Sequence, residues 1–125
     1  MSLAVEKKEK YTLVTIDVEK FDGTVSPDTK SRLVTVNREG EKNIIIDLSK
    51  VKYCDSSGLS AVLVGNRLCR DASGTFVICG LQPTVMKLIT ISQLDSILNI
   101  TNTLSEAEDF LFMTEIENNI NNKNQ

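Results

Sequence analysis

The sequence predicts a single α/β domain in which a small mixed, mostly parallel β-sheet carries packed α-helices. Two observations indicate this class. Short runs of apolar and β-branched residues alternate along the chain with segments of about ten residues that have the apolar spacing of a helix. No internal repeat or linker divides the 125 residues, which suffice for one domain with its own hydrophobic core.

The first third of the chain predicts two strands and a helix. Residues 3–8 suit an edge strand, and residues 11–18 alternate apolar and polar side chains as a half-buried strand does, so we expect a hairpin. Residues 19–25 are expected to form a loop. A helix should begin with Ser26 as its cap and Pro27 at its first position, and it should end near Gly40.

The stretch from Asn43 to Gly74 organises the rest of the chain. Residues 44–48 form a nearly unbroken apolar run, which indicates a strand covered on both faces. A tight turn, Asp55-Ser56-Ser57-Gly58, follows it and leads into a helix that is apolar on most sides. We expect Gly74 to stop this helix.

The last third predicts another strand–helix unit and a C-terminal helix. Residues 75–79 form a compact strand, Pro83 opens a helix, and residues 98–100 suit a short last strand. Ser105 and Glu108 have the spacing of a capping box, which would start the final helix.

The Asn-rich C-terminus offers few side chains to bury. We therefore divide the chain into a domain over residues 1–116 and a disordered tail over residues 117–125.

Composition excludes several functional classes. A net charge of −3 argues against a nucleic-acid partner, which would need a basic face. The chain contains no histidine, so neither a Ser-His-Asp triad nor an imidazole zinc site can be built. No segment approaches transmembrane length, so we expect a cytoplasmic protein without membrane insertion.

Three cysteines, Cys54, Cys69 and Cys79, lie in apolar stretches, and their odd number leaves at least one unpaired. We interpret them as small, reduced core residues.

The Asp55–Gly58 turn has two interpretations. In the purely structural one, Asp55 or Ser56 caps the helix and Gly58 permits a tight turn. In the functional one, the turn is a site, because it offers more capping groups than one helix needs and follows a buried strand, where α/β folds usually place their sites.

The chemistry available at this turn is limited. A nucleophilic serine would lack both a Gly-x-Ser-x-Gly elbow and a histidine base, and nothing in the spacing supports Lys50 or Lys52 as the base. The chain contains neither of the glycine-rich motifs that bind phosphate, Gly-x-x-x-x-Gly-Lys-Ser/Thr and Gly-x-Gly-x-x-Gly. The remaining option is a serine that is itself modified, because phosphorylation would add about 1.5 to 2 negative charges beside Asp55.

Residues 44–59, with the run Asp55-Ser56-Ser57-Gly58-Leu59, resemble the signature of bacterial anti-sigma factor antagonists, which are STAS domains. The resemblance continues through residues 74–81 and through the Pro-x-Val-x-x-Leu pattern at 83–88. It covers most of the chain, roughly residues 4–111.

The resemblance implies a non-catalytic binding module, with no catalytic residue, metal or cofactor. Such proteins bind an anti-sigma factor that is also a serine protein kinase, and binding releases the sigma factor. The kinase then phosphorylates the antagonist, and a serine phosphatase resets the switch.

Residue by residue, the resemblance implies that Ser56 is the phosphoacceptor and that Asp55, Ser57, Gly58 and Leu59 shape the partner-binding surface. Asp22 resembles the acidic residue of an earlier loop close to the phosphosite, although residues 19–22 lack the glycine usual in the family.

Two alternatives remain open at this point. The chain could be a STAS scaffold subunit of a stress-signalling or lipid-transport complex that is never phosphorylated. It could also be a nucleotide-binding domain that uses the same helix N-terminus.

Overall fold

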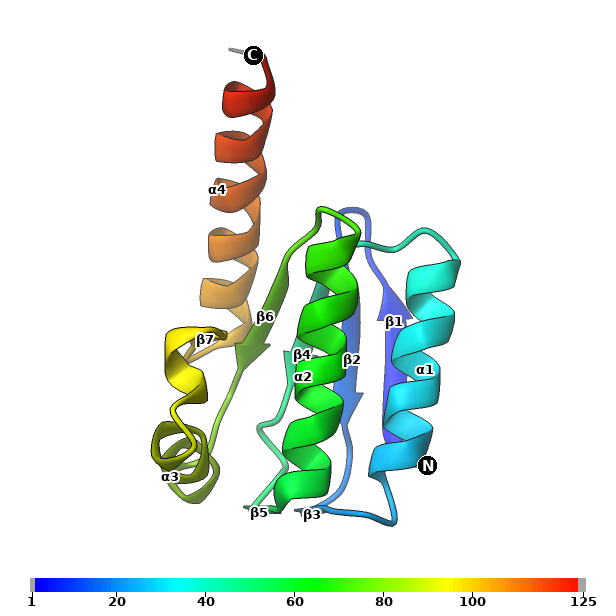
Figure 1. Cartoon of the computed structure of the whole chain (residues 1–125), viewed down its shortest axis with the longest axis vertical. Helices are drawn as coiled ribbons and strands as arrows, with labels where there is room; N and C mark the ends of the chain where they lie inside the picture. The colour runs from blue at the N-terminus through cyan, green and yellow to red at the C-terminus, as the bar shows by residue number, and fades with distance from the viewer. Residues whose placement is uncertain (1, 124–125) are drawn as a thin grey trace.

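The computed structural model describes residues 2–123. Five strands form the main sheet, in the order β1-β2-β4-β6-β7, and β1 is antiparallel to β2 while the remaining pairs are parallel (Figure 1). Their bounds are Leu3–Lys7 for β1, Thr12–Ile16 for β2, Ile44–Asp47 for β4, Phe76–Cys79 for β6 and Asn99–Thr101 for β7. The predicted hairpin and the predicted mixed, mostly parallel sheet are confirmed.

Helices cover both faces of this sheet. α1 and α2 lie side by side on the face seen in front in Figure 1, and α3 packs into the same core. α4 packs on the opposite face. Their bounds are Ser26–Arg38 for α1, Ser56–Asp71 for α2, Pro83–Ile91 for α3 and Leu104–Lys123 for α4, and a short 3₁₀ helix, η1, spans Leu94–Ser96.

The alternation of side chains along each strand explains the two layers. Ile44 and Ile46 on β4 point into the core beneath α1 and α2, whereas Ile45 between them points toward α4. All three are fully buried, which accounts for the unbroken apolar run in the sequence.

A second, two-stranded sheet lies below the main one in Figure 1 and was not predicted. Within the segment expected to be a loop, β3 (Lys20–Phe21) pairs in parallel with β5 (Tyr53–Cys54). Phe21 is fully buried there. Two residues are too few for a period to be recognised, so the sequence gives no strand signal.

The start of α1 differs from the prediction. Val25 occupies the N-cap position and makes no side-chain capping hydrogen bond. Ser26, expected to be the cap, lies in the first turn, and its hydroxyl instead donates to the carbonyl of Ser57 at 2.7 Å.

The end of α2 is a Schellman motif in which a serine takes the usual glycine position. Ser73 has a φ of 62°, and the N–H groups of Ser73 and Gly74 donate to the carbonyls of Arg70 and Cys69. Gly74 is required for another reason, since a Cβ there would lie 1.9 Å from the carbonyl oxygen of Lys42.

The start of α4 lies two residues earlier than predicted. The hydroxyl of Thr103 accepts from the N–H of Glu106, and the Glu106 carboxylate accepts from the N–H of Asn102. Thr103 is therefore the cap, while Glu106 reaches back to the residue before it, and the prediction of a capping box at Ser105 and Glu108 was wrong. Glu108 instead accepts a 2.8 Å hydrogen bond from the hydroxyl of Tyr11.

α4 also continues through Lys123, where the Asn-rich composition predicted disorder, while residues 124–125 of the expected tail lie outside the described residues. The helical backbone over residues 117–123 corrects the expectation of local disorder there. The division into a domain over 1–116 and a separate tail stays a prediction.

Candidate functional site

The first turn of α2 resolves which side chain caps the helix. Oδ1 of Asp55 accepts from the backbone N–H groups of Ser57 at 2.9 Å and Gly58 at 3.2 Å. Asp55 is thus the cap, in an extended conformation, and Ser56 is the first helical residue. The side chain of Ser56 is exposed, so its hydroxyl is accessible and takes no part in capping.

Ser57 has a different environment from Ser56. Its backbone carbonyl accepts from the Ser26 hydroxyl, and a Cβ added to Gly23 would lie 3.6 Å from its side-chain oxygen. Ser57 is partly buried between α1 and the loop that precedes it. Of the two adjacent hydroxyls, that of Ser56 is the one presented to solvent.

Gly58 and Leu59 lie inside the protein. A Cβ on Gly58 would stand 2.5 Å from the carbonyl oxygen of Phe21 and 2.6 Å from Sγ of Cys54. This glycine therefore lets β3 and β5 approach the start of α2, and its backbone angle is not of the left-handed kind expected for a glycine turn. The Leu59 side chain is 7% exposed and belongs to the core, so both residues support the surface from beneath.

Asp22 lies in the loop that reaches the start of α2. Its Oδ1 accepts from the N–H of Thr24 at 3.0 Å and from the Thr24 hydroxyl at 2.7 Å, and these hydrogen bonds lower the pKa of the Asp22 carboxyl. The next residue, Gly23, is the one that faces Ser57. The structure therefore brings the Asp22 loop and the Asp55–Ser57 turn together, as the sequence resemblance implies.

Tyr53 is a candidate contact residue that sequence reasoning missed. In the sequence it stands between Val51 and Cys54, which are both buried. Tyr53 is half exposed on β5, three residues before Ser56. A strand of two residues leaves no period in the sequence, so no sequence signal marked Tyr53 as exposed.

The two lysines that precede the turn in the sequence are each paired with a carboxylate. Lys50 pairs with Asp17 at 3.1 Å and Lys52 pairs with Glu19 at 3.2 Å, and all four side chains are exposed.

The three cysteines are buried and free, as predicted. Burial raises the pKa of the thiol to about 11 in Cys54 and to about 12 in Cys69 and Cys79, so they stay protonated and unreactive near neutral pH.

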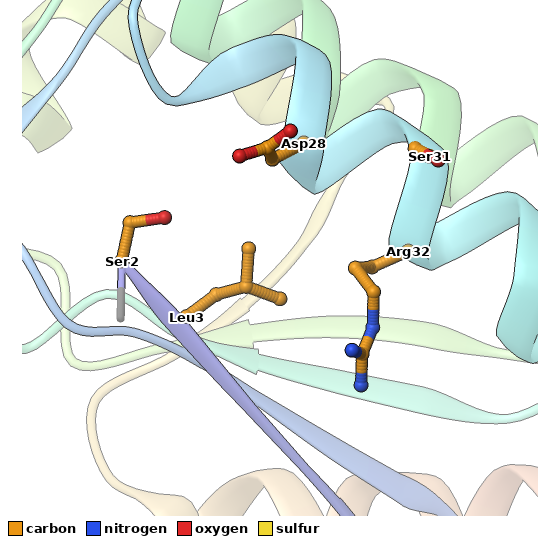
Figure 2. Close-up of a pocket in the computed structure, with 5 residues that line it drawn as sticks. All are labelled: Ser2, Leu3, Asp28, Ser31 and Arg32. Atoms are coloured by element: carbon orange, nitrogen blue, oxygen red, sulfur yellow. The ribbon is translucent and has the colours of Figure 1, made fainter.

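A surface cavity of about 340 Å³ lies between α1 and the start of β1, away from this turn (Figure 2). Figure 2 shows Ser2 and Leu3 below it and Asp28, Ser31 and Arg32 above it on α1. None of the predicted site residues lines this cavity.

Among residues 2–123, no helix combines the length and apolarity needed to cross a bilayer.

Comparison with known proteins gives close agreement on the fold. A crystal structure of an anti-sigma factor antagonist from Mycobacterium paratuberculosis has a TM-score of 0.78 at 21% identity, covering 87% of this chain and 92% of that one. Bacillus SpoIIAA in its phosphorylated form has a TM-score of 0.68 at 21% identity, covering 86% and 96%.

Sequence relatives include the anti-sigma-B factor antagonist of Listeria monocytogenes, which is 28% identical over 109 residues covering 85% of this chain and 95% of that protein. BtrV of Bordetella bronchiseptica is 33% identical over 69 residues, which cover 55% of this chain and only 60% of BtrV. The family model described as the STAS domain matches residues 2–107. Since that match spans every strand and the whole turn at Ser56, the chain belongs to the STAS domain family.

Proposed function

We propose that this chain is an anti-sigma factor antagonist that works by binding and is switched off by phosphorylation of Ser56. The observation that carries the proposal is the exposed hydroxyl of Ser56, which stands first in α2 beside the capping Asp55. Relatives named as antagonists of anti-sigma-B and anti-sigma F factors support the class of partner. SpoIIAA, which shares the fold, is known in an unphosphorylated and a phosphorylated form.

The partner-binding surface in this proposal consists of Asp22, Tyr53, Asp55, Ser56 and Ser57. Gly58 and Leu59 act indirectly, because they hold the start of α2 against Phe21 and the core. The partner is an anti-sigma factor that is also a serine protein kinase, and a serine phosphatase restores binding. Both act in the cytoplasm, and the chain itself catalyses nothing.

Accessibility favours Ser56 over Ser57 as the phosphoacceptor. A kinase must bring its bound nucleotide to the hydroxyl, and the Ser57 side chain is partly buried beside Gly23. A phosphoryl group on Ser56 would lie in the partner interface, where desolvation and repulsion by an acidic or apolar partner surface cost several kcal/mol.

The test begins with co-purification of the anti-sigma factor from the native cell. The recombinant anti-sigma factor is then incubated with this chain and ATP, and the phosphosite is mapped by mass spectrometry. We expect phosphate on Ser56 in the wild type and in Ser57→Ala, and none in Ser56→Ala.

Binding of the same anti-sigma factor is measured in parallel by calorimetry. Ser56→Ala should bind as the wild type does, whereas Ser56→Asp should bind at least tenfold more weakly while keeping its fold by circular dichroism. Phosphate on Ser57 or elsewhere, or full-strength binding by Ser56→Asp, would refute the mechanism.

A further inference from the structure

α4 has two apolar faces, and the main sheet covers only one. Ala107 and Leu111 are fully buried against the sheet. Four large apolar side chains farther along the helix are exposed: Phe112, Met113, Ile116 and Ile120. Their separations of three, four and eight residues bring them together on one side, which we name the outer face of α4.

The outer face lies where the helix leaves the body of the domain. In Figure 1 the later part of α4 extends beyond the sheet, at the end opposite β3, β5 and the start of α2. The STAS match ends at residue 107, so the outer face lies beyond the matched segment. Met113, Ile116 and Ile120 are each more than half exposed, which is unusual for large apolar side chains that lie next to one another.

The charge of α4 indicates what could cover this face. Residues 104–120 contain five acidic side chains and no lysine or arginine. Glu108 and Glu115 turn toward the domain, where they accept hydrogen bonds from Tyr11 and Asn43. The other three, Glu106, Asp109 and Glu117, are exposed, and helical spacing places them along the outer face or at its border.

These acids make some occupants unfavourable. A second copy of the chain would bring two acidic helices together, and an anionic membrane surface would repel the same carboxylates. A helix that carries apolar residues bordered by lysine or arginine would cover the apolar side chains and neutralise the acids. Among the side chains that the structure describes, which end at residue 120, no ion pair engages any acid of α4.

We propose that the outer face of α4 docks a basic amphipathic helix of a partner protein. This surface goes beyond the phosphoswitch, because it lies at the other end of the domain from the start of α2, whose first residue is Ser56 (Figure 1). Binding at α4 is therefore independent of the state of Ser56, and the chain can hold this partner while the anti-sigma factor binds or leaves.

The test uses a synthetic amphipathic peptide of about 18 residues, five helical turns, with leucines on one face bordered by lysines. A peptide with the same leucines bordered by glutamates is the control. Fluorescence anisotropy of each labelled peptide is measured with the full chain. We expect the lysine peptide to bind at least tenfold more tightly than the glutamate peptide.

Matched variants locate the binding. Ile116→Ser should lower the affinity for the lysine peptide at least tenfold. Ile91→Ser is the control, because it removes an isoleucine that is 68% exposed on α3, and it should leave the affinity unchanged. A variant with both Asp109→Lys and Glu117→Lys reverses two charges, and it should bind the glutamate peptide more tightly than the lysine peptide. Ser56→Asp should bind the lysine peptide as the wild type does, which separates this surface from the phosphoswitch.

Three results would overturn the proposal. The first is equal binding of the lysine peptide by Ile116→Ser and Ile91→Ser. The second is a dimer in analytical ultracentrifugation that Ile116→Ser dissociates, with no peptide binding, which would assign the face to a second copy. The third is binding to phosphatidylcholine vesicles that depends on Ile116 without peptide binding, which would assign it to a lipid surface.

Discussion

The hydroxyl of Ser26 donates a 2.7 Å hydrogen bond to the backbone carbonyl of Ser57 and so joins the first turn of α1 to the first turn of α2. Ser26 is 2% exposed, so water cannot easily replace this bond. The contact fixes the Asp22 loop, which immediately precedes Ser26 along the chain, against the turn that presents Ser56.

Ser26→Ala should lower the free energy of unfolding by about 1 kcal/mol, because one buried hydrogen bond is lost. Urea denaturation followed by circular dichroism measures this change. Ser31→Ala is the matched control, since Ser31 lies on the same helix with an exposed side chain. Equal losses in the two variants would mean that the Ser26–Ser57 contact contributes nothing beyond helix propensity.

Gly58→Ala should lower the free energy of unfolding by about 1 to 3 kcal/mol, the usual cost of overpacking. The new methyl group would collide with a backbone carbonyl, that of Phe21, which cannot rotate away. Gly23→Ala is the control, because its methyl group would make an ordinary 3.6 Å contact with Ser57. A Gly58→Ala variant as stable as Gly23→Ala would contradict the close packing of β3 on α2.

The sequence predicted the main sheet and the helix order because buried strands and amphipathic helices leave periodic patterns. The run at residues 44–48 and the two prolines that open α1 and α3 are examples. What it missed depends on contacts between distant residues. Ser26 has the type and position of a cap, yet its hydroxyl finds a carbonyl 31 residues away, and Thr103 takes the capping role expected of Ser105.

At the candidate site, the motif located the turn but could not assign roles within it. Asp55 and Ser56 were equally good caps by residue type, and only the observed hydrogen bonds distinguish them. The exposed position of Tyr53 depends on the β3–β5 pair, whose strands are too short to leave a period in the sequence, and Leu59 belongs to the core beneath the turn.

Stability should fall as the pH rises above about 9. Burial raises the pKa of Cys69 and Cys79 from 9.0 to about 12, and burial together with Glu108 raises that of Tyr11 from 10.0 to about 12. The folded protein keeps these protons at pH values where the unfolded chain loses them. Their contribution is therefore complete below pH 9 and is lost as the pH approaches 12.

Urea denaturation at a series of alkaline pH values, in a non-oxidising buffer, measures this loss. The slope of stability against pH should become shallower in Cys69→Ala, which removes one of the buried thiols. A thiol reagent should label the cysteines only after unfolding. Rapid labelling of the folded protein would show that the thiols are accessible.

Tyr53→Ala should weaken binding of the anti-sigma factor about tenfold, because half-exposed aromatic residues often dominate protein interfaces. Its stability should change little, since the ring is not part of the core. Tyr53→Phe keeps the ring and should retain most of the affinity, as measured by calorimetry with the co-purified anti-sigma factor. If Tyr53→Ala binds as the wild type does, the interface does not include β5.

The effect of a negative charge at Ser56 on the stability of the fold should depend on Asp55. A carboxylate or phosphate on Ser56 gains from the positive end of the α2 dipole, but the N–H groups of Ser57 and Gly58 already donate to Asp55. The added charge therefore meets an occupied cap and a neighbouring carboxylate, which offset the dipole. Asp55→Asn keeps an oxygen that can accept the same hydrogen bonds while removing the negative charge.

Ser56→Asp changes the free energy of unfolding by an amount that should depend on residue 55. This change should be less favourable when residue 55 is the native Asp than when it is Asn. A double-mutant cycle in urea should give a coupling of about 0.5 kcal/mol or more, which shrinks at high salt as the charges are screened. Ser56→Ala in the same series should be nearly neutral, because Ser56 does not cap the helix. A coupling of zero at low salt would mean that Asp55 and a charge on Ser56 do not interact, and that phosphorylation acts only on the partner's side of the interface.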